Sequence, residues 1–98
     1  MSAREQEISA LWTAHRDATW PAGLGTGEGE LMTLDTVIGG FVSYYLEERR
    51  LDPQRLVLLE SCLADLDELM ERIEEPARPY FVRLQTLGRL LMPGDAVS

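Results

Sequence analysis

Any imidazole or thiol chemistry in this chain must use His15 or Cys62, because the sequence contains one histidine and one cysteine. His15 falls near the end of a predicted helix, on its apolar side, where an imidazole usually packs or interacts with the helix dipole. Cys62 has acidic sequence neighbours, whereas a reactive thiol needs an electropositive setting, so we interpret it as a small buried residue. The absence of lysine excludes Schiff-base chemistry. We therefore predict no catalytic residue and no enzyme activity.

Carboxylates are concentrated in one short stretch, which raises the question of a metal site. Residues 60–75 contain seven acidic residues and one arginine, a net charge of −6 out of −8 for the whole chain. The Glu-x-x-His pair of helical di-iron sites and the D-x-[DN]-x-[DN]-G pattern of a calcium loop are both absent. We therefore predict neither a metal ion nor another cofactor. The seven acids are Glu60, Asp65, Asp67, Glu68, Glu71, Glu74 and Glu75.

A glycine-rich segment, residues 18–30, is the other candidate for ligand chemistry. It lacks the lysine of a phosphate-binding P-loop and the third glycine of the dinucleotide pattern G-x-G-x-x-G, and it carries two glutamates where a phosphate would bind. Two interpretations remain open. The segment is a flexible connector, or it becomes ordered on a partner, with Trp20 and Leu24 as hydrophobic anchors.

Local signals at the ends of apolar-periodic segments predict where the helices begin. Ser2 and Glu5 form a capping-box pattern at the start of a helix over residues 3–17. Thr33 is expected to cap a second helix, Leu34 to about Arg50, with Asp35 in its first turn, where the helix dipole favours an acid. A fourth helix is expected to begin within residues 76–80 and to end near Met92.

The third helix has the most regular apolar pattern in the sequence. Asp52 is expected to cap it, with Pro53 at the first helical position. Its apolar residues repeat in steps of three and four, and no segment alternates with the period of a strand. The sequence therefore predicts an all-α fold, a small antiparallel bundle of about four helices in one domain, residues 1–98, with a long Gly-rich loop between helices one and two. The apolar stripe is Leu56, Leu59, Leu63, Leu66, Met70 and Ile73.

Gly39 and Gly40 interrupt the second predicted helix. Each glycine should lower the stability of the helix by about 1 kcal/mol relative to alanine, so another interaction must offset this loss. Close approach of another helix is one explanation, with Gly88 as the counterpart, and a kink is another. A third is a ligand slot over the two glycines, lined by Phe41, Tyr44 and Tyr45. This slot defines an alternative function, that of a small-molecule-binding helical domain.

Composition limits the classes of partner and the expected location. Acids outnumber arginines by 17 to 9, which argues against nucleic acid and against an anionic membrane surface. No apolar run approaches the roughly 20 residues that span a membrane, and the N-terminal residues do not resemble a signal peptide. One cysteine allows no internal disulfide, so we expect a reduced, cytoplasmic setting.

The acidic third helix supplies the leading functional hypothesis. A helix built only for stability would place arginine or lysine four residues after its acids, and here the acidic excess is uncompensated. We expect a small soluble intracellular protein-interaction domain, adaptor-like or inhibitor-like, that presents this helix to a basic protein surface. The competing interpretation is a simple solvated face, and a second copy of the chain is a further candidate partner. The predicted partner-binding residues are Glu60, Asp67, Glu68, Glu71 and Glu74.

Overall fold

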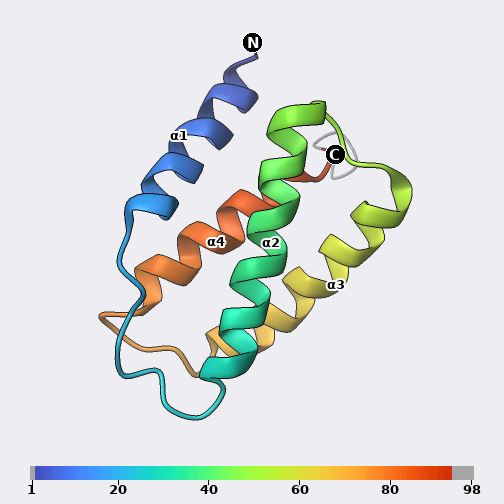
Figure 1. Cartoon of the computed structure of the whole chain (residues 1–98). Coiled ribbons are helices and arrows are strands. Elements are labelled where there is room, and N and C mark those ends of the chain that lie inside the picture. Colours follow the sequence, from blue (N-terminus) through green and yellow to red (C-terminus); the bar gives the residue numbers. More distant parts are fainter. Residues whose placement is uncertain (1, 94–98) are drawn as a thin grey trace.

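The computed structural model describes residues 2–93, in which helices and their connections are the only elements. Figure 1 shows α1 and α3 on either side of α2, with α4 crossing behind α2. α2 and α4 each contact all three of the other helices. The prediction of an all-α fold with four helices is confirmed. The helices are α1 (Ala3–Asp17), α2 (Glu28–Glu48), α3 (Pro53–Met70) and α4 (Arg78–Leu91).

The starts of α1 and α3 follow their local signals. The Ser2 hydroxyl accepts from the backbone N–H of Glu5 at 3.1 Å, and the Glu5 carboxylate accepts from the backbone N–H of Ser2 at 3.3 Å. The Asp52 carboxylate accepts from the backbone N–H of Arg55 at 2.8 Å, with Pro53 as the first helical residue. Both predicted caps are confirmed, because each depends on residues only three positions apart.

The predicted start of the second helix is wrong. α2 begins at Glu28 rather than Leu34, so its connection to α1 is residues 18–27. Gly27 caps the helix with a φ of 98°, a backbone conformation that favours glycine. Thr33 is inside the helix, where its hydroxyl donates to the carbonyl of Gly29 at 3.1 Å. Gly29 in the first turn favours a loop, but Glu28 and Glu30 in the same turn favour a helix start through the helix dipole.

The core forms where the apolar stripes of α2, α3 and α4 meet. Phe81 and Leu84 of α4 are completely buried at its centre. Gly88 lets α3 approach α4 closely, because a Cβ there would lie 2.6 Å from the Cδ2 atom of Leu63. The expectation that Gly88 faces Gly39 is therefore wrong. The predicted stripe of α3 is buried at Leu59, Leu63, Leu66 and Met70, and also at Ile73 just beyond the helix.

Candidate functional site

His15 lies at the centre of a polar network that joins α1, α2 and α4. Its Nε2 atom is 2.7 Å from Oδ1 of Asp35, and the Tyr80 hydroxyl donates to Oδ2 of Asp35 at 3.1 Å. The Arg83 Nε–H donates to Nδ1 of His15 at 3.2 Å. A guanidinium can only donate hydrogen bonds, so Nδ1 of His15 is the acceptor. The Nε2 atom therefore carries the hydrogen and donates to the Asp35 carboxylate. The imidazole therefore has no free nitrogen with which to take a proton from a substrate.

Aromatic rings enclose this network. The rings of His15 and Tyr80 have centroids 4.4 Å apart, and Trp20 meets Tyr80 edge-on at 5.5 Å. Burial, the charge of Asp35 and the hydrogen bond to it together raise the pKa of Tyr80 to about 12. The phenol accordingly remains a protonated donor at neutral pH. The network is a satisfied structural connection between three helices.

The pairing of Asp35 with His15 was not predicted from the sequence. The assignment of Asp35 to the first turn of a helix was wrong, because α2 begins earlier than expected. One signal was present in the sequence: Asp35 is the only charged residue between Leu31 and Leu46. A lone charge in a largely apolar helix predicts a buried polar partner, because an unpaired charge there is costly.

Cys62 is partly buried on α3 and packs against the core. Burial, followed by the negative charge of Asp65, raises the pKa of its thiol. The thiolate is the reactive form of cysteine, so this shift holds the side chain in its less reactive protonated state.

The five predicted partner-binding acids are all exposed. Asp67 differs from the others because two side chains of α4 hydrogen-bond to its carboxylate. Arg89 donates to the two oxygens at 3.0 and 3.2 Å, and Gln85 donates to Oδ1 at 2.5 Å. Among residues 2–93, no arginine or histidine comes within ion-pair distance of the remaining four. Most of the predicted acidic surface is thus uncompensated, namely Glu60, Glu68, Glu71 and Glu74.

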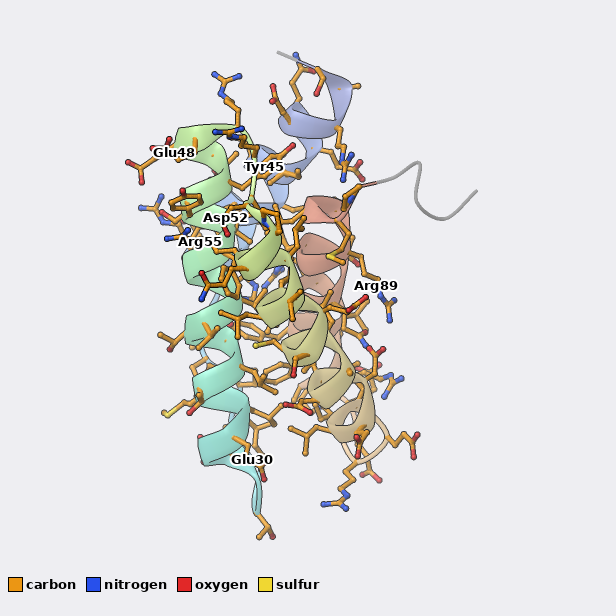
Figure 2. All side chains as sticks on the ribbon, turned by 90° about the vertical axis from the view of Figure 1, so that its right-hand side faces the viewer. Glu30, Tyr45, Glu48, Asp52, Arg55 and Arg89 are labelled. Atoms are coloured by element: carbon orange, nitrogen blue, oxygen red, sulfur yellow. The ribbon has the colours of Figure 1, made fainter. Side chains whose placement is uncertain are left out.

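Two further acids join this surface, Asp65 of α3 and Glu30 of a different helix, α2. Glu30 in the first turn of α2 lies at the end of α2 that is next to the last turns of α3 (Figure 2). It shares an open depression with carboxylates of α3 and with Arg72 at its edge. We call this site the acidic depression; its acids are Glu30, Asp65, Glu68 and Glu71.

The two predicted loop anchors contact the chain's own core. The Trp20 indole N–H donates to the Glu28 carboxylate at 2.8 Å, and its ring packs edge-on against Phe81 at 5.7 Å. Leu24 is partly buried and also packs against the core. These contacts anchor the segment between α1 and α2 on α4 and on the start of α2. A cavity of about 210 Å³ remains between this segment and the α3–α4 connection.

The structure places the residues of the predicted ligand slot on different sides of α2. Gly39 faces α1, where a Cβ would lie 3.0 Å from the Cη2 atom of Trp12. Tyr44 faces α3 and is covered by the Arg55 guanidinium, 3.9 Å from its ring centroid. Phe41 packs against the core, and Gly40 is exposed with no neighbour within 4 Å of a Cβ position. The close approach of the Trp12 ring therefore explains why position 39 is a glycine. It does not explain the glycine at position 40.

A Gly40→Ala substitution is expected to raise the free energy of unfolding by about 0.5–1 kcal/mol. The added methyl group meets nothing, and alanine loses less backbone entropy than glycine in a helix. Gly39→Ala is the matched control and should gain less or lose stability, because its Cβ must displace the Trp12 ring. Urea unfolding of both variants gives the comparison. A lower stability for Gly40→Ala would contradict the prediction.

Two further features of residues 2–93 bear on function, as do the comparisons with known proteins. No group of three His, Cys, Asp or Glu side chains is arranged to hold a metal ion. None of the described helices is both long enough and apolar enough to cross a membrane. Comparison with protein-family models, curated proteins and solved structures finds no match.

Proposed function

We propose that this protein is a small protein-interaction domain, adaptor-like or inhibitor-like, whose acidic depression binds a basic surface of a partner. The observation that carries the proposal is that four exposed carboxylates line one depression, from the first turn of α2 and from the last turns and C-cap of α3. Among the described residues that line it, Arg72 is the single base. Like charges held together in this way repel one another, and only Glu30 has a favourable position within the chain, in the first turn of α2. They do create a negative field that attracts a basic partner.

The helices that carry these acids pack against each other, which supports the proposal. An antiparallel pairing of α2 and α3 accounts for two sets of contacts. Arg55 near the start of α3 stacks on Tyr44 near the end of α2, whereas Asp65 late in α3 lines a pocket with Glu30 early in α2. Buried Leu66 backs the acidic part of α3. Charges on such a preorganised surface lose little entropy when a partner binds.

Replacing three acids of the depression should weaken binding of a basic partner by about 10- to 100-fold, if each lost charge pair costs roughly 0.5–1 kcal/mol. The variant is Glu30→Ser with Glu68→Ser and Glu71→Ser. Affinity capture from the native host, with mass spectrometry at low and high salt, identifies partners, and titration of the purified partner gives the affinity. Captured proteins should carry basic surfaces and should dissociate at high salt.

The control carries the same change in charge at exposed acids outside the depression, namely Glu7→Ser with Asp17→Ser and Glu48→Ser. It should bind the partner as the wild type does. Binding that is equal for both triple variants, or unchanged by salt, would refute the proposed function.

A further inference from the structure

Arg83 is a half-buried cation whose guanidinium is only partly used within the chain. Its Nε–H donates to Nδ1 of His15 at 3.2 Å, and its guanidinium carbon lies 5.5 Å from the centre of the Tyr80 ring. Among residues 2–93, no carboxylate comes within ion-pair distance of Arg83, and the bond to His15 is the only hydrogen bond of its guanidinium. A partly buried charge without a counter-ion is costly.

The buried polar network holds this guanidinium in one orientation. The Nε2–H of His15 donates to Asp35 at 2.7 Å, which fixes the imidazole ring with Nδ1 toward Arg83. Because Nε of Arg83 is occupied, the edge formed by its Nη1 and Nη2 atoms remains available. Such an edge can donate to both oxygens of one carboxylate. The network therefore preorganises Arg83 for a carboxylate from outside the chain.

Arg83 also lines an open groove of about 450 Å³ between α1 and α4, which we call the α1–α4 groove. The start of α4 lies near the end of α1 in Figure 1. The apolar lining consists of Leu11 from α1 together with Pro79 and Val82 from α4. Residues 79, 82, 83 and 86 of the lining share one stripe of α4, about 10 Å long at about 1.5 Å per residue. The groove thus combines an apolar strip with the available edge of Arg83.

The α1–α4 groove is more basic than the chain as a whole. Of the described residues that line it, two are arginines, Arg78 and Arg83, and one is an acid, Glu75, whereas the chain has a net charge of −8. Arg78 donates to the carbonyls of Met70 and Ile73 at 2.8 and 3.1 Å, so its guanidinium is also held in place. Two held guanidinium groups beside apolar side chains complement a segment in which a carboxylate adjoins an apolar residue.

We infer that the α1–α4 groove binds an acidic, apolar peptide segment of a partner protein, with a carboxylate of the segment on Arg83. The groove is open along one side, so it suits a segment whose other side stays in solvent. A small ligand such as a fatty acid usually has most of its surface enclosed, which this groove does not provide. The groove lies on α1 and α4, whereas the acidic depression lies on α2 and the end of α3. The inference therefore does not depend on the proposed basic partner.

Selection of random displayed peptides on the full chain tests the inference. One class of enriched peptides should carry Asp or Glu beside an apolar residue. Arg83→Lys keeps the charge but removes the paired donors, so it should weaken binding of these peptides by about tenfold. Arg50→Lys, the same exchange at an exposed arginine between α2 and α3, should bind them as the wild type does. A selection without an acidic class, or equal binding by the two variants, overturns the inference.

Val82→Asp gives a second readout that leaves the polar network intact. Val82 is 42% exposed, so the substitution disturbs little packing, and its carboxylate repels that of the peptide. It should weaken binding of the acidic peptides by about tenfold. Val57→Asp, the same substitution at a 65% exposed position of α3, should leave binding unchanged, and equal losses for the two variants contradict the inference.

The same selection keeps the two proposals apart. Peptides that bind the acidic depression are expected to be basic, and they should be lost in the triple variant of Glu30, Glu68 and Glu71. The acidic class should be retained by that triple variant and lost in Arg83→Lys. Loss of one class alone therefore identifies which of the two proposals is wrong.

Discussion

An Asp35→Ala variant is expected to lose about 2–4 kcal/mol of its free energy of unfolding. The substitution removes the acceptor of two donors, the His15 Nε2–H and the Tyr80 hydroxyl. His15 is only 5% exposed, so water does not readily replace the carboxylate. Each buried donor left without a partner costs about 1–3 kcal/mol. Urea unfolding followed by tryptophan fluorescence measures the loss, because Trp12 and Trp20 both lie beside the network.

Two comparisons isolate the role of Asp35. Asp65→Ala removes an exposed carboxylate and should change the free energy of unfolding by about 0.5 kcal/mol or less. An absorbance titration should show the pKa of Tyr80 falling from about 12 in the Asp35→Ala variant, since the charge and the hydrogen bond that help to raise it are gone. Equal losses of stability for the two aspartates, or an unchanged Tyr80 pKa, would show that the network does not act as described.

A Phe81→Ala variant should lose about 3–5 kcal/mol, the usual cost of deleting a buried phenylalanine side chain. Phe81 is fully buried on α4 and meets Trp20 and Tyr80 edge-on. The substitution therefore opens a cavity where α4 meets the segment that leads into α2. Thermal and urea unfolding both measure the change.

Val82→Ala is the matched control for this truncation. Val82 is the next residue on α4 and is 42% exposed, so its loss should cost less than about 1 kcal/mol. Losses that agree within about 1 kcal/mol for the two variants would contradict the central place of Phe81 in the core.

α2 takes part in the core, in the polar network and in the acidic depression. One side packs into the core through Leu34 and Ile38, and Asp35 connects a second side to α1 and α4. Glu30 at its start contributes to the acidic depression.

The features that depend on close neighbours in the chain could be predicted from the sequence alone. The Ser2–Glu5 capping box, the Asp52 cap and the buried stripe of α3 all involve residues three or four positions apart. At that spacing the helix geometry alone brings the groups together. The exposure of the acids on α3 follows in the same way, because they lie away from the apolar stripe.

Which helix lies against each face depends on contacts between residues far apart in the sequence, and it became known only from the packed structure. His15 meets Asp35 across 20 positions of sequence, and Tyr80 meets Asp35 across 45. The placement of Glu30 beside the acids of α3 likewise depends on where α2 begins and how it packs. Periodicity specifies that a helix has an apolar and a polar side, but the packing of all four helices into one core sets their order and rotation.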